Sequence, residues 1–146
     1  MITLALPLML AAAAPPSPVI FRCQVGARVA MVTMTRSALT YSFGAPGKPA
    51  LTIVGTASNG KVHRYWGRYV SPLYQLRFIA GDYSYIVYSM EANAKADSAA
   101  VSGVTVLRGK TVVGNYGCKR FSALASESDL IGALPMDGDE YSAMSL

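Results

Sequence analysis

Side chains that could perform catalysis are sparse in this chain. The single histidine, His63, would have to serve any Ser-His-acid triad, and it stands between Lys61 and Arg64, a cationic setting that disfavours an imidazolium. One histidine cannot form a histidine zinc cluster, and without a Cys-x-x-Cys pair thiol redox chemistry is not expected. The three scattered acids between residues 22 and 120 offer no carboxylate pair for glycoside hydrolysis. We therefore expect no catalytic residues, metal or cofactor, and an enzyme of unforeseen type is kept as an alternative.

Aromatic and arginine side chains are interleaved between residues 64 and 77. Tyr, Trp and Arg commonly anchor interfaces, because they pack over a large area and also hydrogen-bond. The same mixture suits stacking on sugar rings and binding of anionic glycans. The alternative is that the aromatic residues only fill a sheet, which is their usual place. We expect an anion- or glycan-facing surface made of Arg64, Trp66, Arg68, Tyr69 and Arg77.

The first fourteen residues have the pattern of an export signal. Residues 2–10 are almost entirely apolar, and four alanines follow them. A short apolar core before small residues is typical of a cleaved secretory signal, and cleavage after Ala13 satisfies the small-x-small rule. A membrane anchor is the alternative, but a span needs about 20 apolar residues. We expect residues 1–13 to be removed and the mature protein to be periplasmic or secreted, with no membrane span.

Cys23 and Cys118 are the only two cysteines, and they stand at the two ends of the segment that has the composition of a folded body. In an oxidising compartment they allow a single intramolecular pairing. Closing so long a loop stabilises a domain by about 4–5 kcal/mol in the chain-entropy account. We expect one disulfide between them, and two buried free thiols are the alternative.

Charge is divided along the chain. The net charge is +5, but all thirteen Lys and Arg fall between Arg22 and Arg120, while five of the eight acids fall after residue 126. A basic body attracts anions such as lipopolysaccharide, anionic polysaccharide or an acidic protein. Alternatively, the acidic tail folds back and neutralises part of its own domain. Export argues against nucleic acid as the partner, so an anionic envelope component or a protein partner is expected.

Short apolar, β-branched and aromatic runs, separated by turn residues, predict an all-β fold. Asn59-Gly60 predicts a type I′ hairpin turn between the fourth and fifth runs. Residues 14–120 are expected to form one antiparallel β-sandwich or small barrel closed by the disulfide. The expected strands are 19–25, 28–35, 39–43, 50–55, 61–66, 73–79, 83–90, 101–108 and 111–118.

Residues 121–146 differ in character from the body. A short helix is expected over 126–134, with Ser126 as its N-cap, acidic residues in its first turn and Pro135 ending it. Residues 137–146 are expected to be an acidic, poorly ordered tail.

Three segments of the body carry recognisable motifs. Residues 41–51 follow the pattern Tyr-x-Phe-Gly-x-Pro-Gly-Lys-x-x-Leu, residues 76–88 contain Leu-Arg-Phe and Gly-Asp-Tyr-Ser-Tyr-Ile-Val-Tyr, and residues 102–118 contain Ser-Gly-Val-Thr-Val, Gly-Lys and Cys118. Together they resemble a family of small exported bacterial proteins with no settled function. The resemblance spans about 21–118 and implies an exported protein of the same fold rather than a particular activity.

More distantly, Ser102-Gly103 is similar to the Ser-Gly dipeptide of the periplasmic inhibitors of C-type lysozyme. That resemblance implies a small disulfide-bonded β-barrel that presents a Ser-Gly loop to the cleft of the enzyme. Val106 stands where those inhibitors have a tyrosine, and a basic body does not complement basic lysozymes.

The sequence thus favours a non-enzymatic, exported binding module of the bacterial envelope, which binds an anionic glycan, lipid or protein through a basic aromatic surface. A periplasmic protein inhibitor of lysozyme type is one alternative, and an uncharacterised enzyme is the other.

Overall fold

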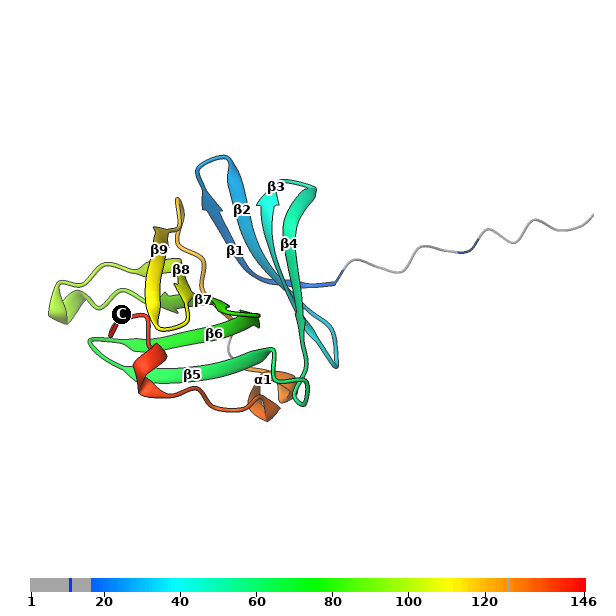
Figure 1. The fold of residues 1–146 in the computed structure, drawn as a ribbon. Coiled ribbons are helices and arrows are strands. Elements are labelled where there is room, and N and C mark those ends of the chain that lie inside the picture. The colour runs from blue at the N-terminus through cyan, green and yellow to red at the C-terminus, as the bar shows by residue number, and fades with distance from the viewer. Residues whose placement is uncertain (1–10, 12–16, 126) are drawn as a thin grey trace, which may run out of the picture.

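The computed structural model describes residue 11, residues 17–125 and residues 127–146. These residues form two antiparallel sheets, each a simple meander (Figure 1). Sheet A contains β1 (Val19–Val25), β2 (Arg28–Met34), β3 (Leu39–Ala45) and β4 (Lys48–Gly55). Sheet B contains β5 (Val62–Arg68), β6 (Pro72–Ala80), β7 (Tyr83–Met90), β8 (Val101–Arg108) and β9 (Thr111–Gly117). The predicted all-β fold is confirmed as a β-sandwich, and the sheets do not close into a barrel.

Local sequence sets most of the hairpins. Gly26 between β1 and β2 has φ 60°, and Gly109 between β8 and β9 has φ 59°. Both lie in the left-handed region, where glycine avoids the steric cost of a Cβ. Each turn therefore folds the chain back antiparallel within one sheet, which explains why both sheets are meanders.

The core lies between the two sheets. Tyr41 of β3 is 1% exposed, and its ring stacks on Phe78 of β6 at 5.3 Å and on Tyr85 of β7 at 5.4 Å between centroids. Because successive side chains in a strand point to opposite faces, each sheet contributes alternate residues to this layer. The largest fully buried members from the two sheets are Phe21, Val32, Leu39, Tyr41, Val62, Leu76, Phe78 and Val87.

The predicted disulfide is confirmed. Cys23 of β1 is bonded to Cys118, which directly follows β9, so the bond joins sheet A to sheet B. A hydrogen bond next to the disulfide also links these two parts of the chain: the Lys119 amide donates to the Gln24 carbonyl oxygen at 3.0 Å.

The Asn59-Gly60 hairpin prediction was wrong. Gly60 does have a positive φ of 72°, but β4 and β5 lie in different sheets and do not pair. The Asn59 side chain instead shapes a loop between the sheets: its Oδ1 accepts from the Thr56 and Lys61 amides at 3.0 Å each, and its Nδ2 donates to the Val54 carbonyl oxygen at 3.0 Å. The Asn59-Gly60 dipeptide therefore indicates a turn, but it does not indicate whether the strands on either side pair with each other.

The C-terminal region is partly as expected. The short helix is present as α1 (Asp129–Ala133), but its N-cap is Ser128, whose Oγ accepts from the Ile131 amide at 3.0 Å. The expected cap, Ser126, lies outside the described residues. Two single-turn 3₁₀ helices also occur, η1 (Ala94–Ala96) and η2 (Asp139–Tyr141).

The prediction of a poorly ordered acidic tail was wrong. Asp137 and Ser142 are buried at 9% and 0% exposure, because residues 135–143 bind along β5 and across the outer face of sheet B, the face turned away from sheet A. In Figure 1 the red C-terminal segment runs beside β5. The acidic segment therefore does fold back on the basic body, the outcome that the charge pattern left open.

The predicted export signal lies almost entirely within residues 1–10 and 12–16, which are outside the described residues, so it stays a prediction. Across the part of the chain that the structure describes, no helix is long and apolar enough to cross a membrane.

Candidate functional site

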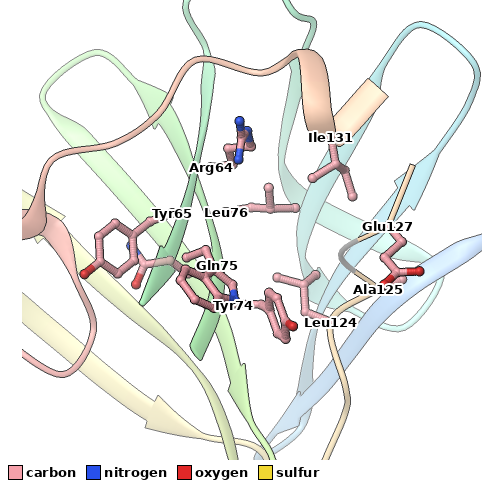
Figure 2. A pocket seen from close by; sticks show the side chains of 10 residues that line it. Arg64, Tyr65, Tyr74, Gln75, Leu76, Leu124, Ala125, Glu127 and Ile131 are labelled. Atoms are coloured by element: carbon pink, nitrogen blue, oxygen red, sulfur yellow. The ribbon is translucent and has the colours of Figure 1, made fainter. Parts of the chain in front are cut away.

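A hollow of about 210 Å³ opens beside β5 and β6 (Figure 2). Figure 2 shows Leu76 and Tyr74 of β6 on one side of it and Leu124 and Ile131 of the returning chain on the other, with Arg64 at one end. Leu76, Leu124 and Ile131 are buried core residues, so the bottom of the hollow is apolar.

Strand pairing explains how Arg64 and Trp66 come to line this hollow. In the register of β5 with β6, Arg64 lies opposite Leu76 and Trp66 lies opposite Tyr74. Both β5 residues share a face with Val62, which is fully buried in the core. Toward the end of β5 this face leaves the core, and Trp66 is 48% exposed.

The C-terminal segment holds Arg64 in place. The Arg64 amide donates to the Pro135 carbonyl oxygen at 2.9 Å, and the Arg64 carbonyl oxygen accepts from the Asp137 amide at 2.7 Å. The Arg64 Nε donates to the Leu134 carbonyl oxygen at 3.2 Å. Met136 thereby forms a parallel bridge with Arg64 on the free edge of β5. Among the described residues neither terminal nitrogen of Arg64 has a hydrogen-bond or ion-pair partner, so both can donate to a ligand.

Arg68 and Tyr69 lie at the end of β5 and do not line the hollow. Arg68 is exposed. The hydroxyl of Tyr69 hydrogen-bonds with Ser142 Oγ at 2.9 Å, and this contact is the main cause of a lowered Tyr69 pKa. Tyr69 therefore also serves to hold the C-terminal segment.

Arg77 lies on the outer face of sheet B, away from the hollow. Its Nε and Nη2 donate to the two carboxylate oxygens of Asp137 at 2.7 and 2.8 Å, and its Nη1 donates to Ser84 Oγ at 3.3 Å. Its guanidinium carbon lies 4.1 Å from the ring centroid of Tyr141. The charge of Arg77 is thus matched within the chain, and we leave Arg77 out of the candidate site.

Two further polar residues on this outer face, Gln75 and His63, lie next to the C-terminal segment or to Arg77. Gln75, at 2% exposure, donates from Nε2 to the Tyr141 carbonyl oxygen at 2.9 Å and accepts at Oε1 from the Ala143 amide at 3.0 Å. His63 lies opposite Arg77 in the register of β5 with β6. Burial, followed by the Arg77 charge, lowers the pKa of His63, while Asp137 acts in the opposite direction.

Ser102 and Gly103 lie inside β8 and are both buried. Ser102 Oγ accepts from the Ser122 amide at 3.0 Å, and its carbonyl oxygen accepts from the Cys118 amide at 2.9 Å. Neither residue is on a loop, so this pair does not provide the exposed Ser-Gly loop that the lysozyme-inhibitor resemblance implies.

The structure therefore brings together only part of the predicted surface. Arg64 and Trp66 share the hollow, Arg68 is exposed nearby, and Tyr69 and Arg77 bind the C-terminal segment. The predicted site set lacked Tyr74, although its alternation with Leu76 in one strand indicated a shared face. It also lacked Leu124 and Ile131. No local sequence pattern indicates that these two residues line the hollow, because their position depends on the path of the chain after Cys118.

Within the described ranges no group of three or more His, Cys, Asp or Glu side chains is placed to hold a metal ion. A scan against protein-family models, a search of curated proteins and a search of solved structures each gave no match for this chain.

Proposed function

We propose that this protein is an exported, non-catalytic binding module of the bacterial envelope that takes one ring of an anionic glycan into the β5–β6 hollow. The observation that carries the proposal is Trp66, an indole that is 48% exposed at the rim of an apolar-floored hollow. Exposed Trp next to a hollow is costly to leave in water and is typical of binding surfaces.

The size and lining of the hollow favour a single ring. Ligand pockets for drug-sized molecules measure about 300–1,000 Å³, whereas this hollow measures about 210 Å³. Trp66 and Tyr74 supply aromatic surface, and Leu76 and Leu124 supply the apolar floor. The rest of a longer glycan would then lie on the surface near the exposed Arg68.

The polar groups of the hollow favour a carboxylated sugar. The open donors of Arg64 suit a carboxylate, because a guanidinium can bind both of its oxygens at once. Glu127, exposed and also lining the hollow, can accept hydrogen bonds from sugar hydroxyl groups. One cation and one acceptor thus orient the ring between aromatic walls.

The test is a calorimetric titration of the mature, oxidised protein with polygalacturonate oligomers and with neutral gluco-oligosaccharides of equal length. We expect the anionic oligomers to bind more tightly, and salt to weaken that preference. Trp66→Ala should weaken both ligands, and Arg64→Lys should reduce only the preference for the anionic one. Tyr83→Ala, at a 39% exposed tyrosine on β7, is the matched control and should bind as the parent does. Absence of binding to both ligands, or equal loss in the control, would overturn the proposal.

A further inference from the structure

A second group of exposed cations gathers at the seam between the two sheets, apart from the hollow described above. After Cys118 the chain follows the free edge of β1: Lys119 donates from its amide to the Gln24 carbonyl oxygen at 3.0 Å, and Ser122 Oγ accepts from the Arg22 amide at 3.1 Å. Arg22 and Gln24 flank Cys23, and Lys119 and Arg120 follow its disulfide partner. The disulfide therefore brings three cations from distant parts of the chain to one place.

These residues surround an open space. A hollow of about 600 Å³ is lined by Arg22, Gln24, Lys119 and Arg120, and no acidic residue within the described ranges lines it. In the described part of the chain the only ion pair is the one between Arg77 and Asp137, so the three cations are not neutralised by a carboxylate. Cations held together without acids raise the local positive potential and attract multiply charged anions.

An adjoining hollow gives the seam an apolar side. Arg22 also lines a space of about 350 Å³ on the outer face of sheet A, whose other walls include Val29, Met31 and two prolines. The Nη1 of Arg22 lies 3.9 Å from Met31 Sδ, so its guanidinium extends over that face. Arg22 therefore stands between a basic hollow and a largely apolar one.

We propose that the basic hollow at the disulfide is a binding site for a phosphate-bearing ligand. A phosphate group carries up to two charges and three open oxygens, so it can meet Arg22, Lys119 and Arg120 together, whereas a carboxylate presents one charge and two oxygens. The side-chain Nε2 of Gln24 donates to the Gly26 carbonyl oxygen at 3.3 Å, and its second N–H adds an uncharged donor. The apolar space beyond Arg22 suits a phosphate carried on a lipid, and a free phosphate compound would use the basic hollow alone.

Inorganic pyrophosphate, titrated by calorimetry at low ionic strength, tests the site directly. The parent protein should bind it, and Lys119→Gln/Arg120→Gln should lower the affinity by about tenfold or more. Arg36→Gln/Lys95→Gln removes the same charge at two exposed positions outside the hollow and should bind as the parent does. Absence of binding by the parent, or an equal loss in both double variants, would overturn the proposal.

Vesicles distinguish the two sources of phosphate. If the ligand is a lipid, the parent should float with phosphatidylcholine vesicles that contain phosphatidic acid, and pyrophosphate should displace it from them. The Lys119→Gln/Arg120→Gln variant should not float with these vesicles. Pyrophosphate binding without vesicle binding would assign the site to soluble phosphate compounds. The Trp66→Ala variant should bind pyrophosphate normally, so failure of the glycan proposal and failure of this one are separate results.

Discussion

Arg77 and Asp137 are 60 residues apart in the chain and form a two-bond ion pair on the outer face of sheet B. The Nε–Oδ2 and Nη2–Oδ1 distances are 2.7 and 2.8 Å, and the two side chains are 12% and 2% exposed. The guanidinium of Arg77 lies against the ring of Tyr141, and the amide of Asp137 also donates to the Arg64 carbonyl oxygen in β5. It therefore fastens the C-terminal segment that also shapes the candidate hollow.

Breaking this pair should destabilise the domain. Asp137→Asn leaves the Arg77 charge largely buried without a counter-charge, and the loss of one partner of a buried pair costs about 3 kcal/mol or more. Urea unfolding should show that decrease, while Asp139→Asn, at an exposed acid on the same segment, should change the free energy of unfolding by less than about 0.5 kcal/mol. Equal effects of the two substitutions would show that the pair does not hold the segment.

The strands were predictable because their signals are local. The alternation of 73–79 and the aromatic run 83–90 match β6 and β7 closely, and glycines mark the turns before β2 and β9. Alternation depends only on neighbouring residues, and a hairpin brings such neighbours together. The expected strand 39–43 likewise lies within β3, where Tyr41 is a core residue.

The arrangement around the site was not predictable in the same way. Arg77 alternates with Leu76, so the sequence does place it on the opposite face, but no local pattern shows that Asp137 lies there too. Likewise, Asn59-Gly60 has the form of a hairpin turn, and only the pairing of β5 with β6 shows that it joins two sheets. Long-range pairings of this kind decide which cations are neutralised and which are free.

Removal of the disulfide should lower stability strongly. The bond closes a loop with a sequence separation of 95 residues, for which chain entropy predicts a loss of about 4–5 kcal/mol in Cys23→Ser/Cys118→Ser. Chemical denaturation in the absence of reductant would measure this difference. Addition of reductant should lower the stability of the parent toward that of the double variant and leave the variant unchanged. A parent whose stability does not depend on reductant would contradict the prediction.

Gly103 should be intolerant of a side chain for a structural reason. A Cβ at this position would lie 2.5 Å from the Tyr116 carbonyl oxygen and 2.6 Å from the Tyr88 hydroxyl oxygen. Overpacking of this kind costs about 1–3 kcal/mol, so Gly103→Ala should lower the free energy of unfolding by that amount. Gly117→Ala is the matched control, because a Cβ there would contact nothing within 4 Å.

The same pair of variants separates a structural Gly103 from one that contacts a lysozyme. A structural glycine predicts lower stability in Gly103→Ala and no loss of lysozyme inhibition beyond the loss of folded protein. Inhibition by the parent, lost in Gly103→Ala at unchanged stability, would contradict the buried position of Ser102-Gly103 in β8.

His63 should make stability depend on pH in a definite direction. Burial and the facing Arg77 charge lower its pKa below the ordinary value of 6.5, against the opposing effect of Asp137. Its Nδ1 is buried and has no hydrogen-bond partner among the described residues, which agrees with a neutral ring. A group with a lowered pKa in the folded state binds protons more readily when unfolded. The contribution of neutral His63 to the free energy of unfolding is therefore intact above pH 6.5. It is lost as the pH falls from there through the pKa of His63 in the folded state.

His63→Gln isolates this effect, because it keeps a polar side chain that does not titrate and leaves the ion pair of Arg77 with Asp137 in place. Urea midpoints at neutral pH and at mildly acidic pH, in buffers free of phosphate, would be compared for the parent and the variant. The parent should lose more stability than the variant on acidification, since only the parent must keep its ring unprotonated beside a guanidinium. An equal loss in both proteins would mean that His63 titrates as it does in the unfolded chain, and the acid sensitivity would then belong to the carboxylates.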